Sequence, residues 1–193
     1  IFGKYVRSVS SDPPTAAGIG EIWYNTSSNT FKTVGFTYAW SSGGNLGTAR
    51  AYMFGVGPQT AALGAGGYNA SYSPVANSEE YNGTAWTEGS NLNTARYGIS
   101  GAGTQTAAVA VGGYPTFSNA EEYNGSSWTN VTAYPVALYQ TAGAGTQTAG
   151  VLFGGSTPTK IAQTTEYDGS SWTTSAPQNL NTARSGMGSG GTQ

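Results

Sequence analysis

Short runs of small and β-branched residues alternate along this chain with stretches rich in glycine, asparagine, serine and threonine. The runs TAAVAVGG (106–113) and TAGVLFGG (148–155) end in a double glycine and are too short for helices. Runs of this kind are typical of buried strands. No stretch shows a sustained helical period, so the pattern predicts an all-β fold.

One repeat unit is expected to contain four strands. In the second unit they fall near Arg96–Ala102, Thr106–Gly113, Ala120–Tyr123 and Ser127–Thr129. The last two would form a hairpin, because an Asn-Gly or Asp-Gly dipeptide lies between them. This dipeptide favours a type I′ turn, in which both central residues have positive φ. It occurs in three units, at Asn82-Gly83, Asn124-Gly125 and Asp168-Gly169.

The same pattern returns at nearly constant spacing, which indicates a repeat architecture. Trp40, Trp86, Trp128 and Trp172 are separated by 46, 42 and 44 residues. Other positions recur in register with the tryptophans: Arg50, Arg96, Leu138 and Arg184; Gln59, Gln105, Gln147 and Gln193; Tyr81, Tyr123 and Tyr167. Length varies mainly between the double glycine and the tyrosine, so we expect a surface loop there.

A hydrophobic run into Gly-Gly, followed by Tyr, Trp and Arg at these spacings, resembles the Kelch motif. The motif is carried here by Val109–Gly113, Tyr123 and Trp128, and again by Val151–Gly155, Tyr167, Trp172 and Arg184. The resemblance covers residues 40–193 and departs at Leu138, which stands in an arginine position. It implies a Kelch-like β-propeller with four-stranded antiparallel blades.

Two segments are expected on this basis: residues 1–39, an N-terminal connector with a short β-meander at 20–39, and residues 40–193, the propeller repeats. The stretches EIWYN, TFKTV and YAW would be the strands of the meander. The chain would then hold about three complete blades plus a partial or composite one. A composite blade with strands from both ends would close a four-bladed ring. The alternative, which we favour, is a chain truncated at its C-terminus from a ring of six or seven blades.

A second resemblance is narrower. GEIWYNTSSNTFKT (20–33), WSSGGNLGTAR (40–50) and GAGTQTAA (101–108) resemble the repetitive virion and tail-fibre proteins of marine and cyanobacterial phages. This resemblance implies an extracellular virion component, carried on a tail fibre or other exposed appendage, that binds the host surface or decorates the particle. It implies other virion proteins and a host-surface glycan or protein as partners, and a homo-oligomer within the virion.

Composition narrows the chemistry that the chain can support. Its 193 residues include no His and no Cys, and only 8% are charged, with a net charge of −2. A Ser-His-Asp triad is therefore excluded, and zinc and copper lose their main ligands. Neither a basic footprint for nucleic acid nor a membrane-length apolar run is visible. We expect no enzyme, no metal and no cofactor; the alternatives are a glycan-active propeller enzyme and a cellular adhesin or scaffold.

The recurring charged residues are expected to be structural. Glu79-Glu80 and Glu121-Glu122 occupy the same place in their units, whereas a catalytic carboxylate pair would be unique. Adjacent strand residues also point to opposite faces. We expect these glutamates to pair with Arg50 or Arg96 across a blade boundary. The alternative is that the arginines line a polar rim that holds an anionic sugar.

The loops after each double glycine are the candidate binding segments. They span Tyr68–Ser78, Tyr114–Asn119 and Ser156–Thr164. Aromatic rings beside hydroxyls and amides suit contact with sugars or proteins. The candidate ligand-binding residues are Tyr68, Tyr72, Tyr114 and Phe117. The alternative is that these loops are ordinary solvated connections.

Overall fold

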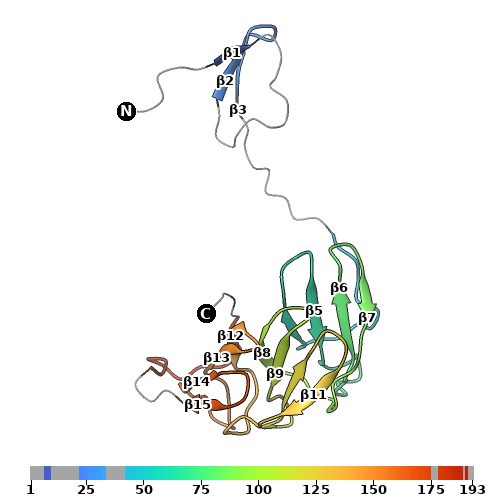
Figure 1. The fold of residues 1–193 in the computed structure, drawn as a ribbon, viewed down its shortest axis with the longest axis vertical. Helices are drawn as coiled ribbons and strands as arrows, with labels where there is room; N and C mark the ends of the chain where they lie inside the picture. Colours follow the sequence, from blue (N-terminus) through green and yellow to red (C-terminus); the bar gives the residue numbers. More distant parts are fainter. Residues whose placement is uncertain (1–6, 10–21, 34–41, 175–177, 189, 191–193) are drawn as a thin grey trace. The chain divides into compact units, whose positions relative to one another are not determined.

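The computed structural model describes residues 7–9, 22–33, 42–174, 178–188 and 190. The chain divides into two compact units, Ile1–Ser42 and Gly43–Gln193. The described residues form strands β1 to β15 and contain no helix (Figure 1). This confirms the prediction of an all-β fold.

The first unit holds a three-stranded sheet. Strands β2 (Ile22–Asn25) and β3 (Thr30–Thr33) form an antiparallel hairpin, and β1 (Arg7–Val9) pairs in parallel with β2. The first two strands of the predicted meander therefore exist as β2 and β3. The third, YAW at 38–40, lies outside the described residues. The sequence pattern did not predict β1, which is only three residues long.

The described residues of the second unit form three four-stranded antiparallel sheets, each with its strands in chain order. Sheet 1 comprises β4 (Phe54–Val56), β5 (Ala62–Ala65), β6 (Ser78–Tyr81) and β7 (Trp86–Glu88). Sheet 2 comprises β8 (Ser100–Gly103), β9 (Ala108–Val111), β10 (Ala120–Tyr123) and β11 (Trp128–Val131). Sheet 3 comprises β12 (Ala142–Thr146), β13 (Ala149–Phe153), β14 (Thr164–Tyr167) and β15 (Trp172–Thr174). The prediction of four strands per repeat is confirmed.

The first strand of the second repeat begins later than predicted. Strand β8 starts at Ser100, whereas the sequence pattern placed its start near Arg96. Gly98, with φ of 65°, lies in the left-handed region and interrupts the extended backbone. Residues 91–99 therefore form a connector that leads from sheet 1 into sheet 2.

The hairpins between the third and fourth strands exist, but the predicted type I′ turn is wrong. Gly83 has φ of 91°, while Asn82 is not among the residues with positive φ. The loop spans residues 82–85 and is closed by a bond from Asn82 N to Ala85 O of 3.2 Å. The Asn82 side-chain oxygen accepts from the amides of Thr84 and Ala85. This local side-chain acceptor stabilises a wider turn in which only glycine needs positive φ.

The three sheets lie side by side in chain order along an arc, as Figure 1 shows, and the described residues do not close this arc into a ring. The first strands meet on the inner side of the arc, where β8 packs against β4 and against β12. Gly143 is required at one such contact, because a Cβ there would collide with the carbonyl of Gly101. Small residues in the first strands therefore let neighbouring sheets approach closely.

Strand β9 explains how the cores are shared. All four of its residues are buried, and successive side chains point to opposite faces. Ala108 and Ala110 contribute to the core against sheet 1, whereas Val109 and Val111 contribute to the core against sheet 3. Sheet 2 is thus covered on both faces, which accounts for its unbroken apolar run.

Candidate functional site: an exposed tyrosine surface

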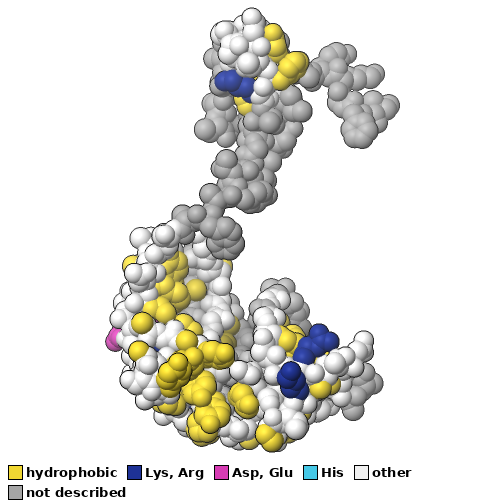
Figure 2. Space-filling view, turned by 180° about the vertical axis from the view of Figure 1, so that it is seen from behind, with side chains coloured by type: hydrophobic (Ala, Val, Ile, Leu, Met, Phe, Trp, Pro, Cys, Tyr) yellow, Lys and Arg dark blue, Asp and Glu magenta, His cyan; other side chains and the backbone are white. Residues whose placement is uncertain are grey.

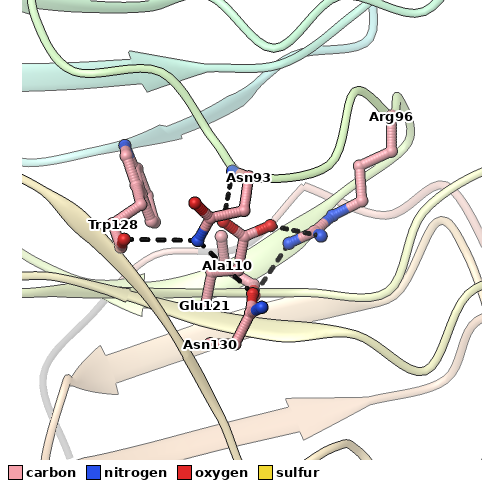
Figure 3. Close-up of polar contacts among 6 residues, drawn as sticks. All are labelled: Asn93, Arg96, Ala110, Glu121, Trp128 and Asn130. Atoms are coloured by element: carbon pink, nitrogen blue, oxygen red, sulfur yellow. Dashed lines mark hydrogen bonds and ion pairs between the residues drawn. The ribbon is translucent and has the colours of Figure 1, made fainter.

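Two recurring arginines form buried ion pairs. Arg50 Nη1 lies 2.8 Å from Glu79 Oε1, and Arg96 Nη1 lies 2.7 Å from Glu121 Oε1. The side chains of Arg96 and Glu121 are both 0% exposed. Figure 3 shows that the second oxygen of Glu121 accepts from the amide of Asn93, at 2.7 Å. The hypothesis of an arginine rim for an anionic sugar is therefore wrong for Arg50 and Arg96, which no ligand can reach.

These ion pairs lie within one repeat, because each arginine precedes the sheet that carries its glutamate. The predicted Arg–Glu pairing is confirmed, but its predicted position across a sheet boundary is wrong. The second glutamate of each pair is the one that reaches the next sheet. Tyr123 donates to Glu80 at 2.5 Å, and Tyr167 donates to Glu122 at 3.0 Å. Burial and the carboxylate of Glu80 raise the pKa of Tyr123 to about 12.

The third repeat replaces the whole ion-pair network with neutral residues. Leu138 stands in the position of Arg96, and Thr165 stands in the position of Glu121. Pro135, which has no amide proton, stands in the position of Asn93. The third repeat therefore lacks the carboxylate acceptor, and it also lacks the guanidinium and the amide proton that donate to this carboxylate in the second repeat. Leu138 and Thr165 are fully buried, so the site remains closed.

The recurring glutamines also join sheets. Gln105 donates from Nε2 to the carbonyls of Ala62 and Tyr81, at 3.1 and 2.8 Å. Gln147 donates in the same way to the carbonyls of Ala108 and Tyr123, at 3.0 Å each. The turn between the first two strands of one sheet thus inserts a primary amide into the preceding sheet. The sequence showed that these glutamines recur, but it did not indicate this role.

Tyrosines from all three repeats meet at the surface of the second unit. We call the following six residues the tyrosine surface: Tyr52, Tyr68, Tyr72, Tyr97, Tyr114 and Tyr139. Neighbouring rings lie 5.0 to 6.5 Å apart between centroids and form one continuous series. Figure 2 shows hydrophobic side chains, a class that includes tyrosine, gathered on one face of this unit.

The rings of the tyrosine surface are accessible in part. Tyr52, Tyr72 and Tyr114 are 56%, 77% and 44% exposed. Partial burial and the hydroxyls of Tyr114, Tyr68 and Tyr139 raise the pKa of Tyr97. Contiguous exposed aromatic surface of this kind marks interaction sites on soluble proteins.

A chain of backbone hydrogen bonds positions the tyrosine surface. Gly98 N donates to Tyr52 O, Gln140 N donates to Gly98 O, and Gly186 N donates to Gln140 O, at 2.8 to 2.9 Å. These four equivalent residues all have positive φ, which favours glycine. Tyr52, with φ of 55°, is nevertheless a tyrosine. A residue held in this region costs on the order of 1 kcal/mol and is found disproportionately at functional sites.

Three of the four predicted binding residues, Tyr68, Tyr72 and Tyr114, belong to the tyrosine surface. Phe117 does not belong to it, because its ring makes none of the contacts that link the six tyrosines. Tyr52, Tyr97 and Tyr139 were not predicted from the sequence. A signal was present, since each lies one or two residues after the recurring arginine position, but nothing in the sequence placed these residues beside the loops.

A cavity of about 870 Å³ lies on the inner side of the arc, where β4, β8 and β12 meet. Its lining consists mainly of glycine, alanine and other apolar residues, with the hydroxyls of Ser100, Thr104, Thr141 and Thr146. No ionisable side chain of the described residues lines it. The cavity therefore offers hydrogen bonds, but it offers no acid, base or charged group.

Comparisons with protein-family models and with curated proteins find no match to the chain. The described part of the chain has no helix of the length and hydropathy needed to span a membrane. Within the same residues, no group of three or more acidic side chains is arranged to hold a metal ion. The fold and contacts define the second unit as an all-β repeat protein with a tyrosine-lined surface.

Proposed function

We propose that this protein is a non-enzymatic recognition module, a Kelch-like β-propeller that binds a host-surface glycan through the tyrosine surface. The proposed carrier is a phage virion, on a tail fibre or another exposed appendage. The mechanism is passive. Rigid sheets hold several aromatic rings on one side, and many weak contacts add together through multivalency.

The observation that carries this proposal is Tyr52. Of the three positions equivalent to it, two are glycine, Gly98 and Gly186, and the third is Gln140. Tyrosine is the less stable choice there, and its ring is mostly exposed and stacks on Tyr68. A residue that costs stability and presents a ring to solvent is best explained by a ligand contact.

The tyrosine surface suits a sugar chain for physical reasons. Tyrosine combines a flat apolar ring with a hydroxyl and loses little conformational entropy on binding. The apolar faces of sugar rings pack on such aromatic rings, and hydroxyls and amides beside them provide hydrogen bonds. The uncharged lining of the 870 Å³ cavity supports recognition over acid–base catalysis.

The virion assignment is supported by the resemblance of residues 20–33 and 40–50 to phage fibre proteins. The small share of charged residues, 8%, also suits a surface in concentrated salt, where exposed ion pairs are screened. Mass spectrometry of purified phage particles tests this part. Detection of the chain only in cell-envelope fractions would favour a cellular adhesin or scaffold.

The binding proposal is tested with purified protein on a printed array of neutral and anionic glycans. We expect binding to a subset of glycans, at least a tenfold loss of affinity in Tyr72→Ala/Tyr114→Ala, and a similar loss in Tyr52→Gly. The matched control is Phe31→Ala, which removes a 68% exposed aromatic ring from the first unit and should leave binding unchanged.

Two results would contradict the proposal. One is a parent protein that retains no glycan; the other is binding that all the tyrosine variants preserve at full strength. Depolymerisation of a bound glycan, abolished by a single substitution, would instead favour a glycan-active enzyme.

A further inference from the structure

Each junction between neighbouring sheets is built from the same two contacts. The later sheet supplies a glutamine from its first turn and a tyrosine from the end of its third strand. The earlier sheet supplies two backbone carbonyls and a glutamate carboxylate. Between sheets 2 and 3, Gln147 and Tyr167 are the donors, and the carbonyls of Ala108 and Tyr123 and the carboxylate of Glu122 are the acceptors.

The outer face of sheet 3 presents the acceptor half of this junction once more. Glu166 occupies the position of Glu122, and the carbonyls of Gly150 and Tyr167 occupy the positions of those of Ala108 and Tyr123. A cavity of about 280 Å³ lies at this place, lined by Thr148, Ala149, Glu166, Tyr167, Asp168 and Thr173. Within the described residues, no glutamine or tyrosine of another sheet donates a hydrogen bond to the Glu166 carboxylate or to these two carbonyls.

Residues 178–188 already lie along sheet 3 in the manner of a connector. Leu180 N donates to Ala162 O at 2.8 Å, as Tyr134 N donates to Ser118 O at 2.8 Å at the previous junction. Arg184 O accepts from Gly155 N, as Leu138 O accepts from Gly113 N. This segment therefore stands in the place of the residues that lead into a following sheet.

Arg184 independently indicates that a following sheet is missing from this face. It occupies the position of Arg96, whose partner is a glutamate on the third strand of the sheet that follows the connector. Arg184 is exposed, and among the described residues no carboxylate pairs with it. Its only side-chain hydrogen bond in that part of the chain goes to the carbonyl of Thr182.

We propose that the outer face of sheet 3 binds a fourth sheet of this same repeat, to which residues 178–188 lead. Its glutamine donates to the carbonyls of Gly150 and Tyr167, its tyrosine donates to Glu166, and a glutamate on its third strand pairs with Arg184. The contact chemistry is that of the two junctions already described. The 280 Å³ cavity is the socket for the glutamine side chain.

The test extends the chain with a sheet that is known to fit this junction. Residues 97–138, which contain sheet 2 and its following connector, are fused directly after Arg184. The fusion is seamless because Arg96 and Arg184 are equivalent. A matched graft carries Ala in place of the copied Gln105 and Phe in place of the copied Tyr123. Urea unfolding and limited proteolysis are measured for the parent and both grafts.

We expect the first graft to resist proteolysis, to unfold together with the parent unit and to raise the unfolding midpoint. The matched graft should lose most of this gain. Glu166→Ala should lower the midpoint of the first graft by about as much as Glu122→Ala does, and should leave that of the parent unchanged.

The proposal is overturned if proteolysis trims the graft away, if both grafts have the same midpoint, or if Glu166→Ala is silent in the extended chain. Sedimentation velocity of the parent tests the alternative that a second copy of the chain covers this face. Oligomers that Glu166→Ala dissociates would show this and would overturn the proposal of a fourth sheet.

Discussion

Copying the neutral residues of the third repeat into the second repeat tests whether well-packed neutral side chains can replace the buried Arg96–Glu121 ion pair. The perturbation is Arg96→Leu and Glu121→Thr, made singly and together, which copies Leu138 and Thr165. Each single change leaves one charge without its partner at a site with 0% side-chain exposure. Removing one partner of such a pair costs about 3–5 kcal/mol.

The double change should cost far less than the sum of the single changes. A buried pair replaced by well-packed neutral residues is often neutral or stabilising, so we expect a loss within about 2 kcal/mol. Part of that loss comes from the Asn93 amide, which no longer has its carboxylate acceptor. An unsatisfied dry amide costs about 1–3 kcal/mol, and we expect the low end of this range because Asn93 is an exposed residue. Adding Leu92→Tyr and Asn93→Pro, after Tyr134 and Pro135, should recover stability by restoring volume and removing that donor.

The assay is urea unfolding at 25 °C followed by tryptophan fluorescence. With a slope of about 2 kcal/mol per molar urea, a single-variant loss of about 4 kcal/mol lowers the midpoint by about 2 M. The matched control is Arg184→Leu, at the equivalent but exposed position, which should change stability by less than about 0.5 kcal/mol. If a single variant has no folded baseline, the quadruple variant still decides the outcome.

Two results would refute the reasoning. Single variants within about 1 kcal/mol of the parent would show that the pair is not buried as described. A quadruple variant as unstable as Arg96→Leu alone would show that the neutral arrangement depends on features of the third repeat that these four positions do not carry.

Three further changes probe the other contacts. Trp128→Ala should destabilise by about 3–5 kcal/mol in urea unfolding, because this ring is a 5% exposed part of the core, whereas Trp86→Ala, at a half-buried ring, should cost less. Gln147→Ala should cost about 1–2 kcal/mol by leaving two carbonyls without a donor, and Gln59→Ala, at the equivalent exposed position, should change the midpoint little. The pKa of Tyr123 in the folded protein, about 12, lies above the usual value of 10, so stability should fall as pH rises from about 10 to 12. Tyr123→Phe should make that fall shallower. An unchanged slope would contradict the Tyr–Glu contact.

Local structure followed closely from the residue pattern. The run of small and β-branched residues at 108–111 forms a strand, and the Asn-Gly dipeptides mark hairpins, because both properties depend on neighbours in sequence. The turn type was predicted wrongly, since the side chain of Asn82 satisfies two amides and removes the need for a second residue with positive φ.

Which side chains pair with which could be predicted only in part from the sequence. The sequence indicated that arginines and glutamates pair, but not that Glu79 and Glu121 face their own connectors while Glu80 and Glu122 face the next sheet. Strand alternation shows that adjacent residues point to opposite faces. It does not show what covers each face, which depends on how neighbouring sheets stack.

What the sequence by itself determined is the repeat, the four strands within it and the absence of histidine and cysteine chemistry, because these depend on residue types and short spacings. Only the tertiary structure decided that Tyr52, Tyr97 and Tyr139, which lie 45 and 42 residues apart, share one surface with the loop tyrosines. The physical reason is that stacking of the sheets brings the connectors and loops of successive repeats within ring-contact distance, and no periodicity along the chain encodes that distance.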